Sequence, residues 1–253
     1  MLQELLPADL FAFFLVFARI GSVMMMMPGF GERYVSPRFR LLLAGAITLL
    51  ITPVIAGVLP PLPSSPLSLF VLLFGEIVVG LFFGTIGRII MSALHTAGTV
   101  MSFQSGLANA LTFDPVSSQQ AAMFALFLSL AGILFVFVTD LHHLMLEAMV
   151  MSYSVLEPGT VPPIDDFSQV ITRLVADSFI LGVQLAAPFI TVGLVFYLGI
   201  GLLARLMPQI QIFFIALPVQ IFLGFLAFAL SVSAMLLWFT NRFEELFTAS
   251  LGG

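Results

Sequence analysis

The sequence contains no cysteine and no lysine, and each absence removes a class of function. Without cysteine the chain forms no disulfide, offers no thiolate to a metal and has no cysteine nucleophile. The eight basic residues are all arginines; they are scattered and are outnumbered by 13 acidic residues. They therefore form no basic patch of the kind that binds nucleic acid. We expect neither redox chemistry nor a nucleic-acid partner.

Charge of either sign is also scarce, because only 8% of the 253 residues are charged. Hydrophobic residues make up 60% of the chain, 28 residues are phenylalanine, and the mean hydropathy is +1.18. This composition is typical of helices that lie in a lipid bilayer. Glu4 and Asp9 stand where a secretory signal would be basic, so we expect the first apolar segment to stay in the protein. The sequence predicts an all-α, polytopic membrane protein.

Six stretches approach the ~20 apolar residues that a membrane-spanning helix needs. They are residues 10–28, 41–59, 67–87, 121–138, 179–204 and 210–240. Cytoplasmic loops are enriched in arginine. Arg33, Arg38 and Arg40 follow the first stretch, while Arg88 ends the third and Arg205 lies between the last two. These three turns are therefore predicted to share the cytoplasmic side, with both termini on the other side.

Two further segments are apolar on a helical period with polar residues opposite, which is typical of helices packed on a surface. They are residues 141–156 and 165–177, separated by the turn-forming sequence EPGTVPP at 157–163. We expect them to be two short helices outside the six spans.

Two charged residues lie inside the apolar stretches, Arg19 in the first and Glu76 in the third. A charge at the centre of a bilayer costs roughly 2.5–3.5 kcal/mol on insertion scales, so neither side chain is expected to face lipid. One interpretation is an ion or proton pathway. The other is an ion pair, or another buried polar contact between helices.

The last two spans contain Pro188 and Pro218, together with the amides Gln184, Gln211 and Gln220. Secondary transporters build substrate sites from such broken helices. A small-solute transporter is therefore an alternative function. Its weakness is that 253 residues is short for an inverted-repeat transporter, and the first four spans do not resemble the last two.

Asp140, His143 and Glu147 share one helical face beside His142, which is a spacing that metal ligands can use. A membrane-embedded metallohydrolase is thus a second, weaker alternative, because polar residues are also common at a membrane edge. The chain has no phosphate-binding loop and no nucleophile motif in a supporting context. We therefore predict no catalytic, cofactor-binding or metal residue.

Gly80 and Gly84 form a GxxxG motif that favours close helix packing, within the chain or against a partner.

Three stretches together resemble one family. They are RIGSVMMMMPGFGERYVSPRFRLLLAGAITLLITP (19–53), SGLANALTFDPVSSQQ (105–120) and ARLMPQIQIFFIALPVQIFLG (204–224). In order and spacing they are similar to the FliR family of flagellar type III export-gate proteins. The sequence departs from the family pattern at Gln211 and Gln220, where the family usually has asparagine and a basic residue.

This resemblance implies a structural and gating subunit of a channel that passes unfolded flagellar substrates across the bacterial inner membrane, in the flagellar basal body. The implied partners are FliP and FliQ in one complex, FlhB, rod-base proteins, the export substrates and membrane lipid. Residues 1–178 would form a FliP-like part and residues 179–253 a FliQ-like helical hairpin. An injectisome export-gate homologue is the related alternative. The chain itself would supply no energy; the candidate energy sources are a partner ATPase and the proton-motive force.

Family members assemble with their helices raised largely out of the bilayer plane, so buried-looking polar residues become contacts between subunits. An isolated chain would leave them unpaired. The residues concerned are Arg19, Glu76, Arg88, Arg205, Gln209 and Gln220.

The resemblance also implies that residues 105–116 are a plug in the secretion pore. Glycine changes its backbone angles cheaply, apolar side chains can fill a narrow lumen, and an Asp-Pro pair ends the segment. The residues expected to carry this role are Gly106, Leu107, Leu111, Phe113, Asp114 and Pro115. The alternative is an ordinary re-entrant loop that only caps helices, because the same residue types are generic turn formers.

Overall fold

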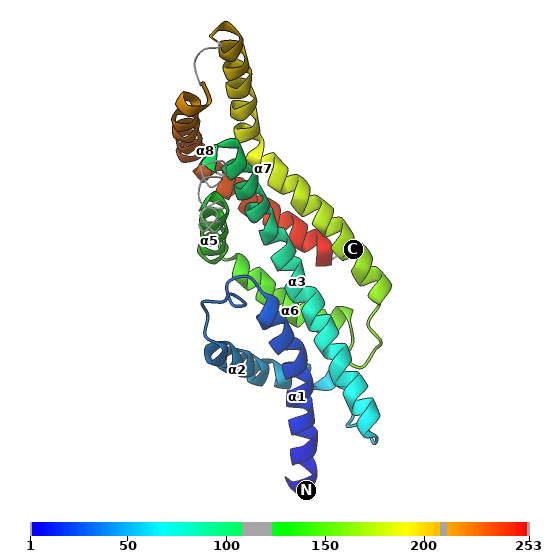
Figure 1. Ribbon diagram of the computed structural model, residues 1–253. Coiled ribbons are helices and arrows are strands. Elements are labelled where there is room, and N and C mark those ends of the chain that lie inside the picture. The colour runs from blue at the N-terminus through cyan, green and yellow to red at the C-terminus, as the bar shows by residue number, and fades with distance from the viewer. Residues whose placement is uncertain (1, 108–122, 208–211, 252–253) are drawn as a thin grey trace. The chain divides into compact units, whose positions relative to one another are not determined.

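The computed structural model describes residues 2–107, 123–207 and 212–251. Within these residues the chain forms seven α-helices, one short 3-10 helix and no strand, which confirms the all-α prediction (Figure 1). The elements are α1 (Leu2–Met26), α2 (Pro37–Ile55), η1 (Ala56–Val58), α3 (Pro66–Gln104), α5 (Met123–Val138), α6 (Leu141–Val155), α7 (Ile164–Leu206) and α8 (Ile212–Leu251).

Five of these helices are long and apolar enough to cross a membrane, or six spans if the bent pair α5 and α6 counts as one. The predicted span at 121–138 is helical only as the 16-residue α5 among the described residues. This length falls short of the ~20 residues that a bilayer requires. The composition therefore located the apolar helices, whereas only the structure shows how long each helix is.

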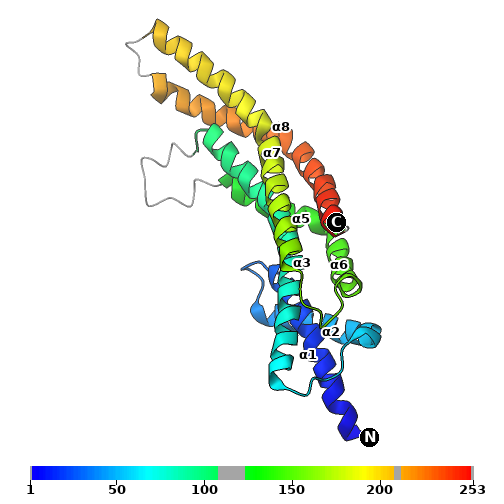
Figure 2. The ribbon, with the colours of Figure 1, turned by 90° about the vertical axis from the view of Figure 1, so that its right-hand side faces the viewer.

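Three helices are longer than the sequence predicted. α3 has 39 residues, α7 has 43 and α8 has 40. The third helix does not end near Arg88 but continues to Gln104, and the separate surface helix predicted at 165–177 is wrong, because these residues are the start of α7. Figure 2 shows α7 as one uninterrupted helix. At ~1.5 Å per residue, each of the three is about twice as long as the hydrocarbon core is thick.

The expectation that proline breaks the last two spans is also wrong. Pro188 lies inside α7 and Pro218 inside α8, and both helices continue through them. Proline removes one backbone donor and often bends a helix, but packing of the neighbouring residues can hold the helix together. The observation that favoured a transporter with discontinuous helices is therefore absent from α7 and α8.

The chain divides into two compact units. The first unit comprises Met1–Ile89, Asp140–Leu174 and Phe247–Gly253. Its core lies where α1 packs on α2, on the first half of α3 and on α6, with Leu15, Ile20 and Ile86 fully buried. α1 ends at Met26 because Pro28 follows and Gly29 adopts a left-handed φ of 84°, and α2 then begins with Pro37 in its first turn.

The second unit comprises Ile90–Thr139 and Val175–Leu246. Phenylalanine rings cluster around the buried Phe124, whose ring lies 6.1 Å from that of the buried Phe189, 4.7 Å from the half-buried Phe228 and 5.3 Å from the exposed Phe225. Gly98 of α3 lies so close to Ala125 of α5 that a Cβ at this position would collide with the α5 backbone. The many phenylalanines of the sequence thus have a packing role here.

Candidate functional site

Arg19 of α1 and Glu76 of α3 form a buried ion pair inside the first unit. Arg19 is 1% exposed and Glu76 is 2% exposed. The Arg19 Nε donates to Glu76 Oε2 at 2.5 Å, and Nη2 donates to Oε1 at 3.1 Å. The contact is thus bidentate, which is the strongest geometry for a guanidinium and a carboxylate.

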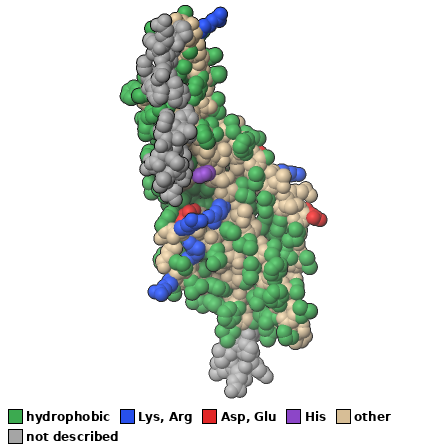
Figure 3. Space-filling view, in the orientation of Figure 1, with side chains coloured by type: hydrophobic (Ala, Val, Ile, Leu, Met, Phe, Trp, Pro, Cys, Tyr) green, Lys and Arg blue, Asp and Glu red, His purple; other side chains and the backbone are tan. Residues whose placement is uncertain are grey.

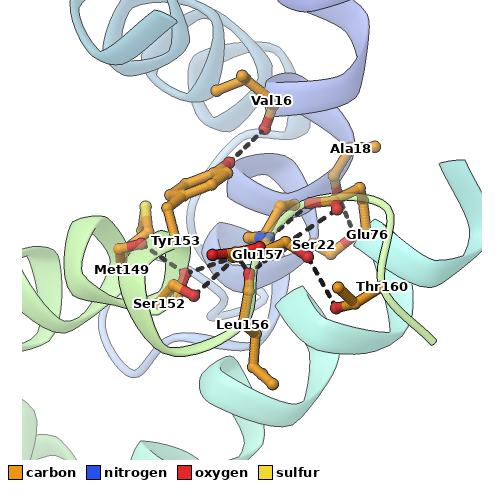
Figure 4. Close-up of polar contacts among 11 residues, drawn as sticks. Val16, Ala18, Ser22, Glu76, Met149, Ser152, Tyr153, Leu156, Glu157 and Thr160 are labelled. Carbon is orange, nitrogen blue, oxygen red and sulfur yellow. Dashed lines mark hydrogen bonds and ion pairs between the residues drawn. The ribbon is translucent and has the colours of Figure 1, made fainter. Parts of the chain in front are cut away.

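The remaining Arg19 donors point at the end of α6. Figure 4 shows Ser152, Tyr153 and Leu156 of this end together with Glu76. Nη1 donates to the Ser152 carbonyl oxygen at 3.0 Å and to the Leu156 carbonyl oxygen at 3.0 Å. The guanidinium carbon lies 4.2 Å from the centre of the Tyr153 ring, and the Tyr153 hydroxyl donates to the Val16 carbonyl oxygen at 3.4 Å. Carbonyl groups at a helix C-terminus carry partial negative charge, so α6 supplies a second favourable partner for the cation.

Glycine allows this pair to form. A Cβ at Gly80, one turn after Glu76, would collide with the Arg19 carbonyl oxygen and the Ser22 Cβ, and a Cβ at Gly84 would meet Met26 and the Val23 carbonyl oxygen. The GxxxG motif of α3 therefore packs against α1 within this chain. Close approach of the two backbones brings Glu76 within hydrogen-bond reach of Arg19.

The expectation that a lone chain leaves these groups unpaired is wrong for Arg19 and Glu76. Both charges were recognisable in the sequence, whereas Ser152, Tyr153 and Leu156, which complete the environment of the guanidinium, were not predicted. The serines and the tyrosine of MSYSVL at the C-terminal end of α6 were the available signal. Because both charges are satisfied, the geometry favours a fixed junction of α1, α3 and α6 over a proton relay.

A second buried polar group lies where α3 ends in the second unit. Gln220 of α8 is 6% exposed, and its side-chain nitrogen donates to the Gln104 carbonyl oxygen at 2.8 Å and to the Tyr197 hydroxyl at 3.0 Å. Gln220, like Arg19, therefore finds its partners within the chain. Because Gln104 is the last residue of α3, the amide joins the end of α3 to both α7 and α8.

Glycines bring the three helices together at this point. A Cβ at Gly224 of α8 would collide with the side chain of Ser105, and one at Gly193 of α7 would lie 2.5 Å from Gln104 Oε1. Gly106 itself has a left-handed φ of 75°, which ends α3, and a Cβ there would lie 3.0 Å from the Gln220 amide carbon. We call Gln104, Ser105, Gly106, Tyr197 and Gln220 the α3 anchor.

The α3 anchor holds the first residues of the predicted plug segment. Gly106 is buried and Leu107 is half-buried. The other residues predicted to plug the pore, Leu111, Phe113, Asp114 and Pro115, lie outside the described residues, as does Gln209. The structure therefore describes how the segment begins at α3.

The other predicted contact residues lie on the surface of the helices. Arg88 is exposed in the middle of α3, with its Nη1 3.7 Å from the Met26 sulfur. Arg205 is exposed in the last turn of α7, where its charge is favourable for the C-terminal end of the helix dipole. Neither residue contacts the Arg19–Glu76 pair or is part of the α3 anchor.

Asp140, His142 and His143 form a histidine cluster near the surface of the protein. The possible ligand atoms of Asp140, His142 and His143 lie within 4.8 Å of one another, whereas Glu147, which shares the helical face of Asp140 and His143 in the sequence pattern, is not part of this group. Asp140 Oδ1 and His143 Nδ1 are 3.5 Å apart, and both side chains are largely exposed. These three residues are where the described part of the chain could hold a cation.

Comparison with known proteins places these features in one family. A family model described as "Bacterial export proteins, family 1" matches residues 10–246. The chain is 40% identical to the flagellar biosynthetic protein FliR of Caulobacter vibrioides, over 92% of each protein. It is 28% identical to FliR of Bacillus subtilis over 93% of this chain and 92% of that protein. It is 27% identical to FliR of Escherichia coli over 90% of this chain and 87% of that protein. The chain therefore belongs to family 1 of the bacterial export proteins, together with proteins named flagellar biosynthetic protein FliR.

Proposed function

We propose that this protein is a structural and gating subunit of the flagellar type III protein-export channel in the bacterial inner membrane. Its family membership supports a component of the flagellar export apparatus, and its apolar helices support a location in a membrane. The curated relatives are named as flagellar proteins, which favours a flagellar over an injectisome complex. The protein would supply the passage for unfolded substrates and would have no catalytic step, with energy provided by its partners.

The α3 anchor is the observation that carries the gating part of this proposal. A plug must be attached firmly at its base if its tip is to leave and re-enter a pore. Gln220 and three glycines fix the end of α3 against α7 and α8, and Gly106 then turns the backbone out of the helix. We propose that residues 105–116 occlude the closed channel and move aside for substrates.

The partners in this proposal are FliP, FliQ and FlhB, with rod-base proteins beyond the channel. Residues 1–178 would take the place of a FliP-like subunit and residues 179–253 that of a FliQ-like hairpin. The lengths of α3, α7 and α8 support an assembly that extends beyond the bilayer. Large apolar side chains exposed along α7 and α8, such as Leu194, Leu202 and Leu230, are available for such contacts.

Co-expression with FliP and FliQ should yield one discrete complex. We expect native mass spectrometry in mild detergent to show one or a few copies of this chain bound to both partners, because the exposed apolar faces favour association. The protein expressed alone is the control. If the chain remains a single species in both preparations, the gate assembly is wrong. Stabilisation of that lone species by a small solute would instead favour a transporter.

Deletion of residues 105–116 should open the closed channel to ions. In cells that make the whole complex, we expect a higher ion leak without export substrate than in the wild type, because the proposed obstruction is removed. Substitution of the exposed Val161 by serine, assayed in the same complex, controls for general damage. Equal leakage of wild type and the 105–116 deletion, with the complex intact, would show that the segment is not a plug.

A further inference from the structure

A cavity of about 430 Å³ lies in the first unit between α1, α2 and the beginning of α3. Its walls are almost entirely apolar and include Phe14, Phe17 and Gly21 of α1, Leu41 of α2 and Ile77 of α3. The one hydroxyl in its lining, that of Ser22, is already bonded to the Ala18 carbonyl oxygen at 2.6 Å. The volume falls within the ~300–1,000 Å³ that is usual for ligand pockets. The cavity interior therefore fits a hydrocarbon and not a polar solute.

Arg40 is the one charged residue in the lining of this cavity. Its Nε donates to the Phe30 carbonyl oxygen at 2.9 Å and its Nη2 donates to the Glu32 carbonyl oxygen at 2.9 Å. Both acceptors are neutral, and none of the ion pairs in the described part of the chain involves Arg40. The guanidinium is thus held in position at the cavity without an ion-pair partner among the described residues.

More positive charge surrounds Arg40. Arg33 and Arg38 are exposed on the same loop and on the first turn of α2, against one acidic residue, Glu32. The N-cap of α2, Ser36, makes no side-chain hydrogen bond to the first turn, so backbone N–H groups there also remain open to an anion. Figure 3 shows arginine side chains gathered in one place on a face that is otherwise largely hydrophobic.

We infer that this cavity binds an anionic phospholipid. One acyl chain fills the space between α1, α2 and α3, and the headgroup phosphate bonds to the guanidinium of Arg40, with Arg33 and Arg38 adding long-range attraction. A guanidinium presents paired donors that match phosphate oxygens. The excess of arginine selects phosphatidylglycerol over phosphatidylcholine, because the second headgroup brings a cation of its own. This inference does not depend on the plug.

The test measures lipid retention by the full-length protein in mild detergent. After delipidation, phosphatidylglycerol or phosphatidylcholine with identical acyl chains is added, and native mass spectrometry counts the bound lipids. We expect one tightly held phosphatidylglycerol, with affinity about tenfold higher than for phosphatidylcholine, as one hydrogen-bonded charge pair provides. The variant Arg40→Gln should lose most of this preference, and only the weaker attraction of Arg33 and Arg38 should remain.

A second variant fills the cavity without touching the charge. A Cβ at Gly21 meets only the Phe17 ring, at 3.7 Å, so Gly21→Leu has room to project into the cavity and leucine suits the helix. The control is Gly45→Leu on α2, where a Cβ meets nothing within 4 Å. Gly21→Leu should lose the bound lipid and Gly45→Leu should retain it. The inference is overturned if wild type binds the two lipids equally, if Gly21→Leu keeps the lipid, or if a partner subunit fills the cavity in the complex.

Discussion

Replacement of Glu76 by leucine is expected to destabilise the protein by about 3–5 kcal/mol, the usual loss when one member of a buried ion pair is removed. Arg19 is 1% exposed, so its charge would remain in the core with carbonyl oxygens, the Ser152 hydroxyl and the Tyr153 ring as its partners. Those neutral partners cannot balance a full positive charge in a low-dielectric environment. Chemical unfolding in detergent, followed by far-ultraviolet circular dichroism, measures this loss.

The control for Glu76→Leu is a pair of the same chemistry on the surface. Arg242 and Glu245 on α8 form an ion pair in which the side chains are 48% and 61% exposed. The variant Glu245→Leu should lose about 1 kcal/mol or less, because water screens the pair. The double variant Arg19→Met/Glu76→Leu should be more stable than Glu76→Leu, since no unpaired charge remains. Equal losses for Glu76→Leu and Glu245→Leu would contradict the structural role of the buried pair.

Substitution of Gly106 by valine is expected to disturb both folding and export. The position has a φ of 75°, and a β-branched residue in this conformation costs of order 1–3 kcal/mol. Its Cβ would also lie 3.0 Å from the Gln220 amide carbon, so the amide that bonds to Gln104 and Tyr197 must shift. We expect reduced swarming and, under the proposed function, an increased ion leak, because the base of the plug segment is displaced.

Two further variants separate backbone strain at Gly106 from a general sensitivity of this unit to substitution. Asparagine tolerates the left-handed conformation better than valine, so Gly106→Asn should be milder in both stability and swarming. Gly199→Val is the matched control, because it lies in α7 of the same unit and a Cβ there meets nothing within 4 Å. A wild-type phenotype for Gly106→Val would rule out a functional α3 anchor. A strong effect of Gly199→Val would instead indicate general sensitivity of this unit.

The fold class followed from the sequence because hydrophobic composition is a local property. A near-absence of charge over ~20 residues identifies a spanning helix whatever the helix packs against. Helix lengths did not follow in the same way. Residues 165–177 carry the amphipathic pattern of a separate helix, yet they continue into α7, because the sequence has no proline or glycine between residues 165 and 181 that would stop the helix.

For the buried polar residues, too, the sequence predicted only part of what the structure shows. Arg19 and Glu76 were recognisable as residues that needed partners, but 57 positions separate them in the sequence. Their pairing depends on the close contact that Gly80 allows between α1 and α3. Leu156 contributes a backbone oxygen, which any residue type could supply, so the sequence held no specific signal for it. The polar side chains of Ser152 and Tyr153 were visible in the sequence, but nothing there linked them to Arg19.

The sequence by itself determined that this is an all-α membrane protein of the bacterial export family, since composition and motif order survive without coordinates. Only the tertiary structure decided that Arg19 pairs with Glu76, that Gln220 joins the end of α3 to α7 and α8, and that Arg40 lies at an apolar cavity. Such contacts depend on which helix faces approach one another across tens of residues. Glycine and side-chain packing set that approach, and one-dimensional periodicity does not encode it.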